Sequence, residues 1–267
     1  MIRLIFTLIL LTPLSALSNV KIVTSITPLS SLASMILGNK GEIKTIASNQ
    51  GCPHSYALKP SDLEKMEQAD LFIYIDKDFD LFATKLLNKF HTHSVEVSTL
   101  PKINIHNNNL HLWLLPKNAI AILEAITQEL IKISPENQPY FEANLKHHIS
   151  KMQLLEQQRQ ELSIISENII TLSDSTEYIL SDIDHKKNYQ NSDYSSLKSN
   201  KKLQELATGN AKCFIISSDQ NAEKYRDLLG PKVVSISTEN WEEDTYLPKT
   251  YYDEYHTILQ SITTGCK

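Results

Sequence analysis

The sequence predicts an α/β protein in which two α/β lobes with mainly parallel sheets are joined by one long rigid helix. Three observations support this fold class. Short apolar runs alternate with helical stripes at close spacing, which is typical of βαβ units. Residues 140–178 contain neither Gly nor Pro, and apolar side chains recur there at helical spacing, which predicts a helix of about 25 residues and about 40 Å. Beyond this helix, shorter strand and helix patterns resume.

The first lobe is expected to alternate four strands with helices. Residues 20–25 form a buried-strand pattern, and the apolar helical stripe of residues 28–37 ends at Gly38, a residue that favours helix termini. Ser61 is a good N-cap for a short helix, and Glu64 three residues later completes a capping box. The remaining patterns predict strands at 43–47, 71–75 and 95–103 and helices at 79–90 and 117–131.

The second lobe is expected to be smaller. Its patterns predict strands at 177–180, 212–216 and 232–236, and helices near 196–207, 221–229 and 249–263. The polar stretch 182–202 predicts a long loop. The chain is thereby divided into a signal peptide at 1–18, an N-terminal metal-binding lobe at 19–135, a linking helix at 136–165 and a C-terminal lobe at 166–267.

The first eighteen residues have the pattern of a secretory signal peptide. Arg3 precedes the apolar run Leu4–Leu11, and the small residues Ala16 and Ser18 precede the expected cut. The alternative is an uncleaved membrane anchor, but this run is shorter than the roughly 18 apolar residues that a spanning helix needs. We therefore expect a soluble protein exported to the periplasm.

Export would place the three cysteines in an oxidising compartment. They are Cys52, Cys213 and Cys266, and an odd number allows one disulfide and one leftover thiol. Cys52 also lies two residues before His54, so a thiolate metal ligand and a small buried residue both remain open readings for it.

Composition disfavours two functional classes. The net charge of the 267 residues is −5, and no basic stripe is present of the kind that neutralises a phosphate backbone, so nucleic acid is not an expected partner. A metallohydrolase would need a general base beside a metal-bound water, and no HExxH or comparable pattern supplies one. We therefore expect a binding protein rather than an enzyme.

Each of two segments contains a histidine near a proline. The first is GCPHSYALKPSD, which contains His54, and the second is HLWLLP, which begins with His111. A rigid flank lowers the entropy cost of holding an imidazole in one direction. A transition-metal site requires this, because several donors must converge at about 2 Å from one ion.

These segments carry a resemblance to a known family. Together with VTSITPLSSLASMILGNKGEI and PENQPYFEANLKHHISKM, they are similar to the periplasmic zinc-binding proteins of ABC importers, the ZnuA-like members of the metal-binding solute-receptor family. The resemblance implies two lobes joined by one helix, with His54 and His111 as metal ligands. It also implies a monomeric receptor that captures Zn²⁺ between the lobes and delivers it to a membrane permease.

The C-terminal half departs from the family pattern. The family's third ligand lies in a strand-end motif of the form F-H-D-A-x-x-Y, and aligning it with residues 180–185 puts Ser181 at the histidine position. His185 is then the candidate third ligand, and Glu239 or Asp219 would supply a carboxylate. This departure keeps open a manganese receptor of the same family, or a degenerate receptor with weak metal binding and an adhesion role. The resemblance further implies a Cys213–Cys266 disulfide.

Overall fold

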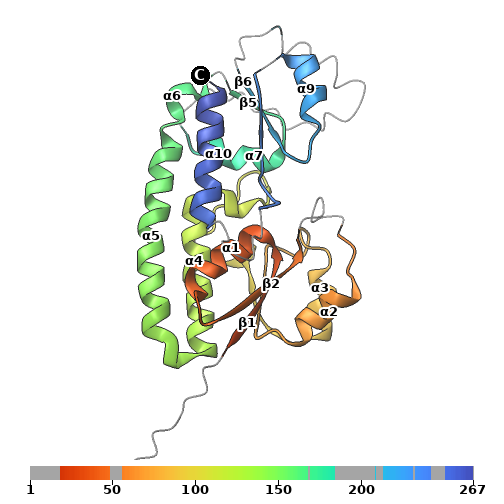
Figure 1. Ribbon diagram of the computed structural model, residues 1–267, viewed down its shortest axis with the longest axis vertical. Helices are drawn as coiled ribbons and strands as arrows, with labels where there is room; N and C mark the ends of the chain where they lie inside the picture. The colour runs from red at the N-terminus through yellow and green to blue at the C-terminus, as the bar shows by residue number, and fades with distance from the viewer. Residues whose placement is uncertain are drawn as a thin grey trace, which may run out of the picture.

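The computed structural model describes residues 19–48, 56–167, 169–183, 208, 213–230, 232–241 and 250–266. The described residues form two parallel sheets, one with the strand order β2-β1-β3-β4 and one with the order β5-β6-β7. Helix α5 (Gln138–Gln160) runs along one side of the molecule past both sheets (Figure 1). The predicted fold class, two α/β lobes beside one long helix, is confirmed.

The first sheet belongs to the N-terminal lobe. Alternate residues of its central strands face opposite sides. Ile22 and Ile73 pack into the core beneath α1 and α4, whereas Val23 and Phe72 pack with α2 and α3 on the other face. The bounds of its elements are β1 Val20–Ile26, α1 Thr27–Leu37, β2 Gly41–Ala47, α2 Pro60–Glu67, β3 Leu71–Tyr74, α3 Ala83–Lys89, β4 His93–Glu96 and α4 Pro116–Ile133.

The second sheet belongs to the C-terminal lobe and is built on the same parallel plan. Its elements are α6 Ser163–Ser166, β5 Ile169–Thr171, α7 Asp174–Leu180, β6 Cys213–Ser217, α9 Ala222–Leu229, β7 Val233–Ile236 and α10 Tyr251–Gly265. A disulfide joins Cys213, the first residue of β6, to Cys266 just after α10, as expected. Helix α10 also packs on α5, so the end of the chain is tied to both the sheet and the long helix.

Four sequence predictions differ from the structure. The strand predicted at 95–103 is β4 (His93–Glu96) followed by a 3₁₀ turn, Val97–Thr99. The strand predicted at 177–180 is the end of helix α7, and the helix predicted at 79–90 spans only Ala83–Lys89. The fourth concerns a helix cap: α2 begins at Pro60, so the N-cap is Lys59 rather than Ser61. The backbone N–H of Lys59 donates to Asp62 Oδ2 at 2.9 Å.

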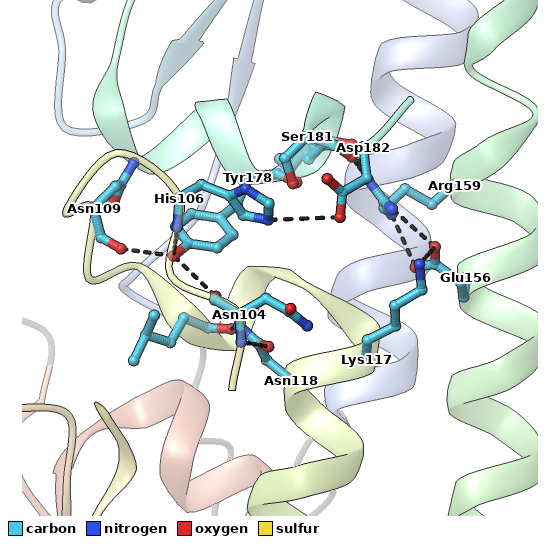
Figure 2. Close-up of polar contacts among 12 residues, drawn as sticks. Asn104, His106, Asn109, Lys117, Asn118, Glu156, Arg159, Tyr178, Ser181 and Asp182 are labelled. Atoms are coloured by element: carbon cyan, nitrogen blue, oxygen red, sulfur yellow. Dashed lines mark hydrogen bonds and ion pairs between the residues drawn. The ribbon is translucent and has the colours of Figure 1, made fainter. Parts of the chain in front are cut away.

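A buried arginine joins the long helix to the C-terminal lobe. Arg159 of α5 is 0% exposed and forms an ion pair with Glu156 one turn earlier, with 2.8 Å between Nη2 and Oε1. It also donates to the backbone carbonyls of Ile179 and Ser181 at the end of α7 (Figure 2). These contacts satisfy carbonyls that a helix end leaves without intrahelical partners, so α7 is fixed against α5.

The carboxyl ends of the two sheets face each other. Thr27 follows β1, and its hydroxyl donates to the backbone carbonyl of Glu239 at 2.9 Å, although Glu239 follows β7 in the other lobe. The same hydroxyl accepts the Trp241 N–H at 3.0 Å. Ligand sites in open parallel sheets lie beyond the carboxyl ends of the strands, so this junction is where a site is expected.

A membrane-spanning helix is not found in the described part of the chain, where each helix is too short or too polar to cross a bilayer.

Candidate metal centre

His111 is held at the junction by the apolar residues that follow it. The 3₁₀ turn Leu112–Leu114 is completely buried, and Pro116 then starts α4 with its ring at the first helical turn, where a missing N–H costs nothing. The edge of the Phe79 ring packs against the imidazole, with 5.4 Å between ring centroids. His111 is 8% exposed, so its ring is fixed by packing rather than free in a solvated loop.

The imidazole of His111 meets a carboxylate from the other lobe. Its Nε2 lies 2.9 Å from Glu239 Oε1, and both side chains are almost buried. Glu239 is itself well anchored, since Thr27 holds its carbonyl and Trp113 Nε1–H donates to the Thr238 carbonyl at 2.8 Å. One of the two carboxylate candidates from the sequence therefore lies directly beside the predicted histidine.

The other imidazole nitrogen is also engaged. Asn109 Oδ1 lies 2.6 Å from His111 Nδ1 and accepts the His111 backbone N–H at 3.1 Å. Nδ1 is therefore directed at an amide of its own loop, and Nε2 is directed across the junction. Histidine metal ligands usually form a hydrogen bond through one ring nitrogen and coordinate the metal through the other.

The spacing of the two donors suits a small divalent cation. A tetrahedral Zn²⁺ with bonds of about 2.0–2.1 Å separates neighbouring donors by about 3.3 Å. The Nε2–Oε1 distance of 2.9 Å is a few tenths of an ångström shorter, so small side-chain rotations would admit an ion. Imidazole nitrogen and carboxylate oxygen are both ligands that zinc accepts.

Of the remaining predicted site residues, the structure describes only Asp219. His54, His185 and Cys52 fall outside the described residues. Asp219 is exposed in the turn after β6, and no contact among the described residues joins it to His111 or Glu239. No group of three or more His, Cys, Asp or Glu side chains able to hold a metal occurs in the ranges that the structure describes.

The strand-end motif that the family resemblance associates with a third ligand has a second match eight residues before the one predicted. The motif follows the end of a strand, and the structure has strand β5 at Ile169–Thr171. The residues after β5 are Leu-Ser-Asp, and Tyr178 follows four residues after the aspartate, as the motif's tyrosine does. The histidine position of the motif is therefore Ser173 rather than Ser181. Its hydroxyl lies 2.8 Å from Ser175 Oγ, which accepts from Thr238 Oγ1 at 2.9 Å, so this position adjoins the segment that carries Glu239. In this alignment too, a serine stands where the family motif has a histidine.

A loop of the N-terminal lobe is fastened to α7 beside this site. Figure 2 shows the Tyr178 hydroxyl between His106 and Asn109; it donates to the Asn109 carbonyl at 2.6 Å and accepts the His106 N–H at 3.2 Å. His106 Nε2 lies 3.6 Å from Asp182 Oδ2. No local sequence pattern marks the role of this Asn-rich loop, because the role depends on contacts that form only in the fold.

A cavity of about 550 Å³ lies at the opposite edge of the first sheet. It is lined by residues around the starts of β3 and β4, including Asp70, His91 and His93. Because this is the amino edge of parallel strands, the cavity is separate from the His111–Glu239 junction.

Comparison with known proteins gives a matching family model and similar sequences. The family model described as "Zinc-uptake complex component A periplasmic" (ZnuA) matches residues 22–265. An uncharacterised protein of Rickettsia prowazekii, RP014, is 33% identical over 253 residues, covering 93% of this chain and 84% of its own length. The high-affinity zinc uptake protein ZnuA of Yersinia pestis is 25% identical over 164 residues, which cover 49% of this chain and about half, 52%, of that protein.

The fold has close structural counterparts. The periplasmic zinc-binding protein TroA from Treponema pallidum superposes with a TM-score of 0.77 at 16% identity, and the match covers 93% of this chain and 99% of that one. At this identity the likeness concerns the fold alone.

Proposed function

The chain belongs to the ZnuA family of periplasmic zinc-uptake components, and on that premise we propose that it captures Zn²⁺ at the junction of its two lobes and delivers it to an ABC-type permease. The proposed ligands are His111 and Glu239, with His54 as a further imidazole. The metal is cargo in this proposal, so the protein binds and releases it without turning over a substrate. The proposed location is the periplasm, reached through the leader at residues 1–18.

The His111–Glu239 pair is the observation that carries this proposal. The two side chains come from different lobes, and only 2.9 Å separates Nε2 from Oε1. At that distance a proton must lie between a nitrogen and a carboxylate oxygen. A divalent cation would take the place of that proton and be attracted by the carboxylate more strongly, because it carries twice the charge.

The anchoring of the chain just beyond His54 supports its inclusion. Tyr56, two residues later, donates from its hydroxyl to Asp62 Oδ2 at 2.8 Å, and its ring packs against Phe82 at 5.5 Å between centroids. Burial and the neighbouring Asp62 raise the pKa of Tyr56 to about 12, so this hydroxyl keeps its proton and its hydrogen bond at neutral pH. The described chain therefore resumes at a fixed point two residues after His54.

Zinc titration of stripped protein tests the proposal. Calorimetry on the chain without its leader should detect one Zn²⁺ per molecule, bound more tightly than Mn²⁺. His111→Ala and Glu239→Gln should each lower the zinc affinity at least tenfold, and His54→Ala should do the same. His91→Ala is the matched control, because His91 is an exposed histidine of the same lobe at the far edge of the sheet, and it should leave the affinity unchanged. Tight zinc binding that survives His111→Ala would contradict the proposed site.

A further inference from the structure

The side-chain amide of Asn109 bridges the two lobes. Its Nδ2 donates to the backbone carbonyl of Asp174 in α7 at 2.7 Å and lies 3.4 Å from Glu177 Oε2. Its Oδ1 faces His111, as described above. Asn109 is 9% exposed, and the Tyr178 hydroxyl holds its backbone carbonyl from the other lobe (Figure 2).

The oxygen and the nitrogen of this amide can be assigned in only one way. A backbone carbonyl only accepts hydrogen bonds, so the amide nitrogen must face Asp174. A backbone N–H only donates, so the amide oxygen must face His111. The same oxygen lies 2.6 Å from His111 Nδ1, and that nitrogen must therefore carry a hydrogen.

The consequence for the imidazole is specific. A neutral imidazole has one N–H and one lone pair, so a hydrogen on Nδ1 leaves the lone pair on Nε2. Nε2 is the nitrogen that faces Glu239. When a metal replaces the proton between Nε2 and Glu239, the acceptor at Asn109 keeps the remaining hydrogen on Nδ1. Without that acceptor, the neutral ring could carry its hydrogen on either nitrogen.

We propose that Asn109 is a positioning residue that holds His111 in the Nδ1–H tautomer and directs its Nε2 at the metal, and that the Asp174 carbonyl of the opposite lobe sets the direction of Asn109. The inference rests on the proposed function, since it concerns how a proposed zinc ligand is presented. If Asn109 has this role, the orientation of His111, a proposed ligand from the N-terminal lobe, depends on α7 of the C-terminal lobe.

Three variants separate this role from general stabilisation of the loop. Asn109→Leu removes the acceptor and should weaken zinc binding by about 10–100-fold, the usual effect of losing an outer partner of a metal ligand. Asn109→Asp keeps an oxygen for His111 but loses the N–H that donates to the Asp174 carbonyl, so it should bind zinc more tightly than Asn109→Leu and less tightly than the wild type. Asn107→Gly is the matched control, because Asn107 Nδ2 also donates to Glu177, at 2.8 Å, without touching His111, and glycine accepts its φ of 52°. This control should leave the affinity unchanged.

The tautomer itself is measured by ¹⁵N NMR of the His111 ring. Wild-type protein loaded with zinc should show a protonated Nδ1 and a metal-bound Nε2, and Asn109→Asp should show the same pattern. Coordination through Nδ1 in the wild type would overturn the inference even if Asn109→Leu fails to fold. Equal losses of affinity in Asn109→Leu and Asn107→Gly would also overturn it.

The same data distinguish the two proposals. If His111→Ala leaves zinc binding intact, the proposed function fails. If His111→Ala abolishes binding while Asn109→Leu does not affect it, the proposed function stands and only the role of Asn109 is refuted.

Discussion

Asp80 should make the stability of the protein fall as pH rises. This carboxyl is 0% exposed, in the turn between β3 and α3. The Ile75 N–H donates to its Oδ2 at 2.6 Å, but its Oδ1 has no hydrogen-bond partner among the described residues. Burial raises the pKa of Asp80 from an ordinary 3.8 to about 7, against the opposing effect of the Ile75 N–H. The folded protein therefore keeps a proton that the unfolded chain has already lost.

The sign and size of the effect follow from linkage. Between pH 4 and pH 7 the native state binds one more proton than the unfolded state at this residue, so the free energy of unfolding decreases with pH. Each tenfold change in proton affinity corresponds to about 1.4 kcal/mol, so the rise from 3.8 to about 7 amounts to about 4 kcal/mol. This contribution is fully present below pH 4 and is lost as the pH passes through 7.

The variant Asp80→Asn isolates this contribution. Asparagine keeps an oxygen for the Ile75 N–H and stays neutral at every pH, so it resembles the protonated acid. Urea unfolding, followed by the fluorescence of the buried Trp113 and Trp241, should give similar stabilities for the two proteins at pH 4. At pH 8 the variant should be more stable by up to about 4 kcal/mol.

Asp78→Asn is the control for this comparison, since Asp78 is an exposed carboxylate of the same turn. Its difference from the wild type should change little with pH. A stability difference between Asp80→Asn and the wild type that is constant from pH 4 to pH 8 would refute the reasoning, as would a variant that becomes relatively less stable with rising pH.

Two further predictions concern the attachment of the C-terminal lobe. Arg159→Met leaves Glu156 without its buried partner and should cost about 3–5 kcal/mol of unfolding free energy by urea titration. The double variant with Glu156→Gln should recover part of that loss, and no recovery would argue against the ion pair as its source. Replacing Cys213 and Cys266 together by serine opens a loop closed over a separation of 53 residues and should lower stability by about 4 kcal/mol, which thermal unfolding detects. An unchanged melting temperature would contradict this.

The fold was predictable where elements are long and their periodicity is clear. Helix α5 (Gln138–Gln160) has no helix breaker after its first turn, and β1 is rich in β-branched residues and forms a buried central strand. Short apolar segments were ambiguous. Residues 177–180 read as a strand, but they end a helix whose residues from Ser175 onward are all buried, so no polar face marks its period. The true strand, β5, has only three residues.

Only part of the candidate site could be predicted from the sequence, because its geometry depends on how the two sheets meet. His111 became a candidate through the motif around it, and Glu239 through the family resemblance, which implies a carboxylate ligand. Their meeting at 2.9 Å required the two sheets to be apposed at their carboxyl ends, which no local pattern encodes. The register that put Ser181 at the third-ligand position assumed a strand at 177–180, where the structure has the end of α7, and a strand end adjoins Ser173 instead.

The Thr27 hydroxyl has an evolutionary consequence. One oxygen serves both the Glu239 carbonyl and the Trp241 N–H, so it acts once as a donor and once as an acceptor. Valine has the same shape but would leave two main-chain groups from the other lobe without partners, and only serine offers the same pair of bonds. Divergence at position 27 should therefore be confined to hydroxyl amino acids, even though this residue need never touch the cargo.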